Sequence, residues 1–234
     1  MSKSWIRYGL AAALIALAVV RLGLFPPQAR AKEIPAPAMD ASLASKPGQD
    51  TVVFSGGCFW GVQAVFQHVK GVISATSGYS GGQAKTAEYE VVSTGGTGHA
   101  ESVEVVFDPS QITYGQLLHV FFSVAHDPTE LNRQGPDEGT QYRSVVFFST
   151  PEQERLTRAY IDQLDKAHVF KHAIVTQVVP LKEFYPAEAY HQNYATIHPD
   201  SMYIRFNDAP KVENLKKEFS QIYRESPQLV AVKK

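Results

Sequence analysis

Apolar residues recur with strand and helix periodicities from about residue 51 onward. Residues 51–54 (Thr-Val-Val-Phe) form a short apolar run that is typical of a buried strand. A glycine pair then turns the chain. A helical spacing follows, carried by Phe59, Val62, Phe66 and Val69.

The same two periodicities continue to about residue 223. Strands are predicted at 71–79, 102–107, 144–148 and 174–179, and helices at 114–124, 151–167, 187–194 and 211–223. Strands that alternate with helices predict one α+β domain whose sheet is covered by helices. No internal repeat interrupts this pattern.

The amino-terminal segment has the pattern of an export signal. A basic start with Lys3 and Arg7 precedes an apolar run at 8–20, and Ala29-Arg30-Ala31 forms a cleavage pattern. We therefore predict a signal peptide at 1–31 and an exported, periplasmic or otherwise extracytoplasmic protein. An uncleaved membrane anchor is the alternative, which Arg21 disfavours because it interrupts the apolar stretch. A flexible linker at 32–50, a catalytic domain at 51–225 and a tail at 226–234 complete the predicted organisation.

Composition excludes several classes of function. The formal net charge is -1, so a nucleic-acid-binding role has no electrostatic support. The chain contains a single cysteine, Cys58, which excludes an intramolecular disulfide and a cysteine-rich zinc or iron–sulfur site.

The single cysteine lies where a strand is predicted to turn into a helix, in Gly56-Gly57-Cys58-Phe59-Trp60. The free amide groups and the positive end of the helix dipole would surround the sulfur there. This position favours the thiolate, which is the reactive form of cysteine. A buried, inert cysteine is the competing interpretation, and from this segment alone the two stand about even.

Two further loop–strand junctions carry polar groups. Glu101 precedes the strand at 102–107, and partial burial would raise its pKa and allow it to donate a proton. Asp137 and Tyr142 precede the strand at 144–148, where a phenol could donate a hydrogen bond. Taken singly, these residues read as a solvated strand-end charge, a turn residue and a core aromatic. Together they suggest a cleft, although their spacing does not establish that they converge.

Other motifs are incomplete. His168 and His172 have the spacing of a metal-binding pair, but no glutamate follows His168 and solvated residues at a helix end are the favoured interpretation. The glycine-rich segment 78–86 lacks the Gly-Lys-Thr step of a phosphate-binding loop, and no G-x-S-x-G motif is present. No metal site is predicted.

Several motifs together resemble the type A peptide methionine sulfoxide reductase family over about residues 51–223. The matching segments are Gly-Cys-Phe-Trp-Gly at 57–61, Thr-Gly-His-Ala-Glu at 97–101, Asn-Arg-Gln-Gly at 132–135, Gly-Thr-Gln-Tyr-Arg-Ser at 139–144, and Tyr-Pro-Ala-Glu at 185–188 followed by His191-Gln192. The resemblance implies an α+β fold with a ferredoxin-like two-layer α/β sandwich core, extended by additional helices and loops. It also implies reduction of the S epimer of free and protein-bound methionine sulfoxide.

The resemblance further implies a role for each matching residue. Cys58 would attack the sulfoxide sulfur and become a sulfenic acid, and Glu101 would protonate the sulfoxide oxygen. The other implied residues are Tyr89 and Tyr142 as hydrogen-bond donors to that oxygen, Asp137 as a support, Phe59 and Trp60 as an apolar wall, and Tyr194 nearby.

The chain departs from the family pattern at two places. Residues 211–234 contain no cysteine that could resolve the sulfenic acid, so we expect an external reductant, either a thioredoxin-like protein or a small thiol, and no bound cofactor. The tyrosine at 89 also lacks the proline that commonly precedes it.

Two alternative functions are open at the level of sequence. A thiol peroxidase or thiol transferase would use Cys58 without requiring a sulfoxide. A non-catalytic methionine-binding module would use Phe59 and Trp60 and would retain binding without the thiol. Neither accounts for Glu101, and both are less favoured than the reductase. Contact with a membrane is expected only if the amino-terminal segment is uncleaved.

Overall fold

The computed structural model describes residues 34–231. The predicted signal peptide or anchor, 1–31, lies outside them and stays a prediction. None of the helices in the described residues is both long and apolar enough to cross a membrane.

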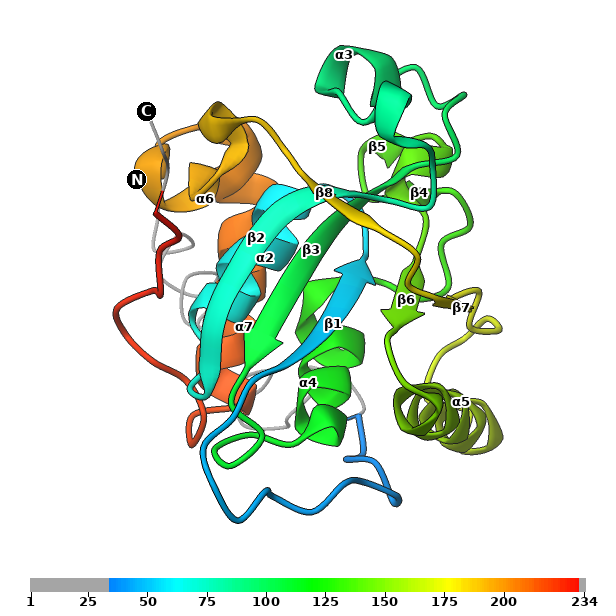
Figure 1. Cartoon of the computed structure of the whole chain (residues 1–234), viewed down its shortest axis with the longest axis vertical. Helices are drawn as coiled ribbons and strands as arrows, with labels where there is room; N and C mark the ends of the chain where they lie inside the picture. Colours follow the sequence, from blue (N-terminus) through cyan, green and yellow to red (C-terminus); the bar gives the residue numbers. More distant parts are fainter. Residues whose placement is uncertain (1–33, 232–234) are drawn as a thin grey trace, which may run out of the picture. The chain divides into compact units, whose positions relative to one another are not determined.

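A six-stranded sheet forms the centre of the domain (Figure 1). Its order is β7 (Gln177–Pro180), β6 (Val145–Phe148), β1 (Asp50–Ser55), β3 (Ala100–Phe107), β2 (Val72–Ser80) and β8 (Phe184–Pro186). Neighbouring strands are antiparallel except β6 and β7, which are parallel. The predicted strands at 51–54, 71–79, 102–107 and 144–148 are confirmed.

The chain path through the inner strands is ferredoxin-like. The elements follow the order β1, α2 (Phe59–Gln67), β2, β3, α4 (Tyr114–Val120) and β6, and the four strands lie in the order β6-β1-β3-β2. The predicted α+β, two-layer sandwich is therefore confirmed. The edge strands β7 and β8 widen the sheet on either side.

Alternation along β1 separates the two faces of the sheet. Val52 and Phe54 belong to the large core beneath the helices. Val53, between them, points to the other face, where it joins a smaller cluster with Ala100 and Phe147. Since successive side chains of a strand point to opposite faces, both faces of the central strand are covered by apolar groups.

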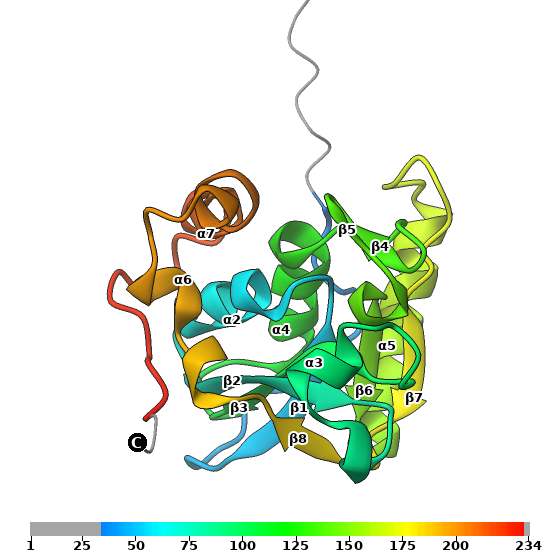
Figure 2. The ribbon, with the colours of Figure 1, turned by 90° about the horizontal axis from the view of Figure 1, so that it is seen from above.

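The helices lie mainly on one face of the sheet. Figure 2 shows α2 and α4 between the sheet and α7 (Ala209–Glu218). The helix α4 continues as the π-helix η2 (Phe121–Ala125), and a second π-helix, η5 (Ile204–Asp208), leads into α7. The predicted helices at 59–69, 114–124, 151–167 and 211–223 are thus observed, the third as α5 (Pro151–Lys166).

The segment after β8 differs from its prediction. A helix was predicted at 187–194, but the chain forms a short 3-10 turn, η4 (Ala189–His191), and α6 starts at Tyr194 and ends at Ile197. The reason is tertiary: the Gln192 side chain accepts from the Ser77 backbone N–H and donates to the Ser77 carbonyl, at 2.9 and 2.8 Å. These bonds hold residue 192 against β2, and Asn193 then takes a left-handed conformation (φ 59°) that separates the two short helices.

Short elements in the loops carried no periodicity and were not predicted. They are η1 (Ala84–Thr86), α3 (Tyr89–Val92), the hairpin of β4 (Arg133–Gln134) with β5 (Asp137–Glu138), η3 (Thr140–Tyr142) and β8. The predicted strand at 174–179 is observed from Gln177. Helices of three or four residues and two-residue strands are too short to show a repeat.

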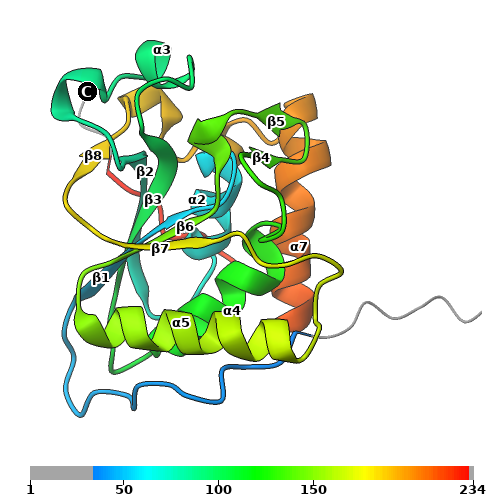
Figure 3. The same ribbon diagram turned by 90° about the vertical axis from the view of Figure 1, so that its right-hand side faces the viewer.

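The segment before β1, predicted to be a linker, contains no helix or strand in residues 34–49 but is hydrogen-bonded to the domain. The Tyr160 hydroxyl of α5 donates to the Pro35 carbonyl at 2.8 Å, and Gln163 contacts both Ala36 and Ala38. Figure 3 shows this segment, in blue, running along α5. The bonds attach it to the same helices that cover the sheet.

Asp40 in this segment binds the start of α4. Its carboxylate accepts from the Thr113 hydroxyl and, at 2.7 Å, from the Gly115 backbone N–H. Asp40→Ala is expected to lower the free energy of unfolding by about 1 kcal/mol, the usual contribution of a helix cap. Urea unfolding measures the change. The matched control is Asp162→Ala, whose exposed pair with Lys166 at 3.5 Å should contribute only a few tenths.

Candidate active site

Cys58 lies at the junction between the central strand and the first helix. β1 ends at Ser55, Gly57 adopts a positive φ of 85°, and Cys58 is the N-cap of α2. A side chain at residue 57 would also collide with Gln134 of β4. Glycine therefore allows both the sharp turn and the close approach of the neighbouring loop. The cysteine itself is 8% exposed.

The protonation of Cys58 differs from the sequence-based expectation. The backbone N–H of Trp60 donates to its sulfur and lowers the pKa, as expected for a helix start. Burial, however, raises the pKa of this thiol well above its ordinary value, and the carboxylates of Glu101 and Asp208 raise it further. Burial therefore opposes the effect expected from the helix start, and desolvation outweighs the helix in the net direction of the thiol pKa.

Glu101 is a buried carboxyl next to Cys58. Its carboxyl is 3% exposed, and it accepts a hydrogen bond from the backbone N–H of Phe59, the residue next to Cys58, at 3.0 Å. Burial raises the pKa of Glu101 to about 8, an effect that the Phe59 N–H partly offsets and that Asp137 and Asp208 increase. A carboxyl in these surroundings is protonated at neutral pH and can donate a proton.

The two tyrosines and the aspartate that sequence reasoning selected gather around the same point. Burial raises the pKa of the Tyr142 phenol, and the charges of Glu101, Asp137 and Cys58 raise it further. Burial likewise raises the pKa of the Tyr89 phenol, and the charges of Glu101 and Cys58 raise it further. Both phenols stay protonated and can donate hydrogen bonds. The structure therefore brings together residues from α2, α3, β3, β5 and η3.

Loop–loop hydrogen bonds fix the two tyrosines. The Thr140 hydroxyl donates to the Gly95 carbonyl at 2.6 Å, and the Gln141 amide donates to the Ser93 carbonyl at 3.1 Å. Arg143 donates to the carbonyls of Gly98 and His99, at 2.9 and 3.0 Å. The loop that carries Tyr142 is thereby attached to the loop between α3, which carries Tyr89, and β3, which carries Glu101.

Aromatic side chains form the apolar part of the site. Trp60 is half-buried and stacks on Tyr194, with ring centroids 3.7 Å apart and an interplanar angle of 10°. Phe59 is 1% exposed and packs 5.0 Å from the ring of His191. The structure thus places Trp60 and Tyr194 at the accessible part and Phe59 beneath it.

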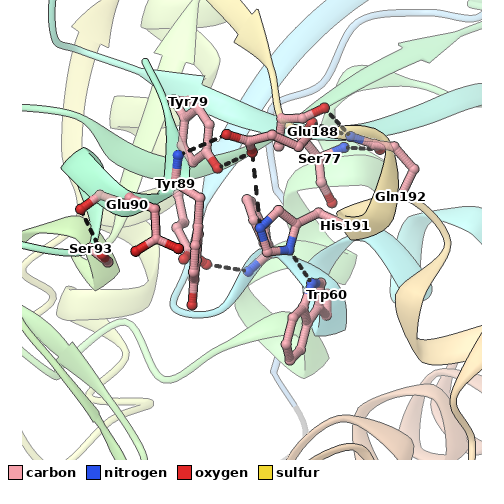
Figure 4. A network of polar contacts seen from close by, with 12 residues as sticks. Trp60, Ser77, Tyr79, Tyr89, Glu90, Ser93, Glu188, His191 and Gln192 are labelled. Atoms are coloured by element: carbon pink, nitrogen blue, oxygen red, sulfur yellow. Dashed lines mark hydrogen bonds and ion pairs between the residues drawn. The ribbon is translucent and has the colours of Figure 1, made fainter. Parts of the chain in front are cut away.

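A polar network holds the aromatic groups in place (Figure 4). The Trp60 indole N–H donates to Nδ1 of His191 at 3.2 Å. Glu188 accepts from the Tyr79 hydroxyl at 2.9 Å and from the Tyr89 backbone N–H at 2.8 Å. Burial lowers the pKa of His191, so the ring is neutral and its Nδ1 can accept. The motif at 185–192 therefore orients Trp60 and Tyr89.

Three residues near Cys58 were missed by sequence reasoning. The Tyr203 hydroxyl donates to Asp137, and its ring meets the edge of Trp60 at 5.8 Å. Asp208 is fully buried and paired with Lys211 at 3.1 Å. Tyr203, Asp208 and Lys211 lie in or next to the π-helix η5, which has no clear apolar period. Only two weak features of the sequence could have indicated them: a glycine inside α2 and a lysine in the first turn of α7.

A comparison with protein families adds a decisive observation. Residues 50–223 match the family described as peptide methionine sulfoxide reductase. The chain belongs to the peptide methionine sulfoxide reductase family. This confirms the resemblance inferred from the motifs, and it makes the chain an oxidoreductase.

Relatives in this reductase family match most of the chain. Peptide methionine sulfoxide reductase MsrA 2 of Mesorhizobium japonicum is 59% identical over 192 residues, which cover 82% of this chain and 97% of the relative. The protein of the same name from Synechocystis sp. is 47% identical over 203 residues, covering 86% and 95%.

Solved structures of the reductase family share the fold. Reduced Mxr1 from Saccharomyces cerevisiae is 29% identical with a TM-score of 0.61, covering 70% of this chain and 92% of that one. Methionine sulfoxide reductase A of Corynebacterium diphtheriae is 36% identical with a TM-score of 0.56, covering 66% and 77%.

His168 and His172 remain separate from the reductase site. Both are exposed and follow the end of α5 at Lys166. Within residues 34–231, no three His, Cys, Asp or Glu side chains are grouped so that they could hold a metal ion.

Proposed function

We propose that the chain reduces the S epimer of free and protein-bound methionine sulfoxide to methionine and so repairs oxidised proteins. The observation that carries this proposal is the adjacency of nucleophile and acid: the Phe59 N–H, one residue after Cys58, donates to the buried Glu101 carboxyl at 3.0 Å. Family membership supports the reaction. The epimer choice follows from the family's type A motifs, since each epimer has its own enzyme.

The reaction needs both groups at once. The Cys58 sulfur attacks the sulfoxide sulfur while Glu101 protonates the oxygen, which is a poor leaving group until it is protonated. Tyr89 and Tyr142 donate hydrogen bonds to the same oxygen, and Asp137, bound by Tyr203, supports the site. The oxygen passes to Cys58, so methionine leaves as the two-electron-reduced product and the cysteine becomes a sulfenic acid.

The aromatic groups are suited to the rest of the substrate. Trp60, braced by Tyr194 and by the hydrogen bond to His191, offers a flat apolar surface to a sulfoxide's methyl group. Phe59 closes the base of this wall. The accessible side of the site consists of loops, which suits methionine sulfoxide in exposed or unfolded segments of proteins.

Regeneration requires a thiol from outside the chain. Cys58 is the sole cysteine of the sequence, so no second cysteine can form a disulfide with the sulfenic acid. An external thiol forms a mixed disulfide with Cys58 and releases water, and a second thiol then restores the cysteine. A thioredoxin-like protein and a small thiol both satisfy this requirement, without a bound cofactor.

The place of action follows from the amino-terminal pattern. The basic start, apolar run and Ala-Arg-Ala at 29–31 support export and a role against oxidative stress outside the cytoplasm. Membrane attachment would follow only if this segment is retained.

Turnover of the separated S and R epimers, with dithiothreitol as reductant, tests the proposal. We expect methionine from the S epimer alone. Without reductant, one methionine per chain should form together with one sulfenic acid, trapped by dimedone and located at Cys58 by mass spectrometry. No methionine from either epimer by folded, reduced protein would refute the proposal. Peroxide consumption would then support the peroxidase, and binding of sulfoxide without turnover would support the methionine-binding module.

A further inference from the structure

An ion pair between a buried aspartate and a partly buried lysine lies against the first turn of α2, the helix that begins next to Cys58. Lys211 donates to Oδ1 of Asp208 at 3.1 Å, and the two side chains are 18% and 0% exposed. The other carboxylate oxygen of Asp208 is buried and has no hydrogen-bond partner among the described residues. A buried pair with unmet hydrogen bonds is weak evidence for a stabilising role, because desolvation offsets the attraction.

Two residues with poor intrinsic preference for their helix positions accommodate this pair. Gly61 lies inside α2, where glycine is a poor helix former. A Cβ at residue 61 would collide with the Asp208 carboxylate and lie 2.8 Å from Nζ of Lys211. Lys211 itself lies in the first turn of α7, where the helix dipole disfavours a cation. Local costs that serve one tertiary contact are typical of a functional site.

The charge of Lys211 reaches groups on several sides of the site. Burial is the largest influence on the pKa values of Cys58, Asp137 and His126. The Lys211 ammonium lowers the pKa of all three. These residues come from the N-cap of α2, from β5 and from the segment after η2. Together with the contact at Gly61, this places the ammonium beneath the start of α2.

The remaining ionisable groups around Cys58 do not supply this positive charge. They are Glu101 on β3, Asp137 on β5, Asp208 on η5, Tyr203 just before η5, Tyr142 on η3, Tyr89 on α3 and the neutral, buried His126. Each is an acid or a phenol, apart from His126, whose pKa burial lowers to about 4. Burial, Glu101 and Asp208 raise the pKa of the Cys58 thiol, and it is lowered by the Trp60 N–H and, more weakly, by the Lys211 ammonium.

We propose that Lys211, held by Asp208 against the first turn of α2, is a positioning residue that stabilises the thiolate form of Cys58. It touches neither the substrate nor the reacting atoms in this proposal, and it acts through the charge of the nucleophile. The proposal rests on the function proposed above, in which Cys58 is the nucleophile. Ionisation of the thiol can nevertheless be measured without any sulfoxide, so the two can fail separately.

The test is the pH dependence of Cys58 alkylation by iodoacetamide in the full chain, which reports on one thiol because the sequence has a single cysteine. Lys211→Met removes the cation and leaves the Asp208 carboxylate, so the midpoint should shift upward by about one pH unit. Asp208→Asn removes the anion and keeps the cation, so the midpoint should shift downward. Lys211→Arg keeps the charge and should restore the midpoint to within a few tenths of a unit of the unmodified chain.

The opposite signs separate an electrostatic role from a structural one. Lys216→Met is the matched control on the same helix, since Lys216 is 57% exposed and pairs with Glu225, and its midpoint should be unchanged. Equal midpoints in the Lys211→Met and Asp208→Asn chains, or shifts in the same direction, would overturn the proposal. If circular dichroism shows that Lys211→Met does not fold, the other two variants test the proposal. A downward shift in Asp208→Asn with an unchanged midpoint in Lys211→Arg supports it, and any other pair of midpoints overturns it. A confirmed shift in a chain without sulfoxide turnover would refute the function alone.

Discussion

A chain with serine in place of Cys58 is expected to form no methionine from either sulfoxide epimer. A serine hydroxyl is a far weaker nucleophile than a thiol, and it cannot pass through a sulfenic acid state. With no second cysteine in the sequence, nothing in the chain can take over the step. We expect kcat to fall below detection, with methionine quantified by chromatography after reaction with dithiothreitol.

The fold should tolerate Cys58→Ser, because the substitution changes one buried atom at a helix N-cap position where serine is a favoured residue. Circular dichroism and thermal unfolding provide this control. Dimedone should label the unmodified chain after a single turnover and leave the Cys58→Ser chain unlabelled. Residual turnover above one hundredth of the unmodified rate would contradict the assignment of Cys58 as nucleophile.

Glu101→Gln is expected to lower kcat/KM by about 10² to 10⁴, the usual contribution of a positioned general acid. Glutamine keeps the shape and can still accept the Phe59 N–H bond, but it has no proton to donate. Steady-state kinetics with the S epimer measures the loss. The matched control is Glu104→Gln on the same strand, a half-buried carboxyl whose pKa burial also raises, and its kcat/KM should stay within about twofold.

The pH profile gives Glu101 a separate signature. The attacking form has a thiolate at Cys58 and a proton on Glu101. Below pH 8 Glu101 is protonated and kcat/KM rises with pH as the thiol ionises. Above the Glu101 pKa of about 8 the gain in thiolate is cancelled by loss of the acid, so the profile levels off. In the Glu101→Gln chain this break should be absent, with the rise continuing toward the raised pKa of the thiol. The same break near pH 8 in both chains would contradict the role.

The active site was predicted best where a short motif carries the chemistry. Cys58, Glu101, Tyr89, Asp137 and Tyr142 were each named from the sequence, and the structure gathers them around one point. Their roles remain proposals. The motif at 185–192 was recognised without a role for His191 or Glu188, because these side chains form hydrogen bonds with residues 131 and 99 positions earlier in the chain.

The electrostatics could not be predicted in the same way. The helix start at Cys58 was correctly located, and its N–H bond does lower the pKa of the thiol. The pKa of the thiol is nonetheless raised overall, because it depends on how deeply the sulfur is buried and on the carboxyls of Glu101 on β3 and Asp208 on η5. Burial of one atom by distant segments leaves no pattern in the local sequence.

The amino-acid sequence by itself determined the order of most strands and helices, the α+β class, the family and the residues proposed as nucleophile and acid. These follow from local periodicity, turn residues and short motifs, which act between neighbours in the chain. Only the tertiary structure decided the path of residues 187–197, the position of the Lys211–Asp208 pair beneath α2 and the protonation of Cys58 and Glu101. Those properties arise from contacts between segments far apart in the sequence, where desolvation and approach distance, rather than local propensity, set the energy.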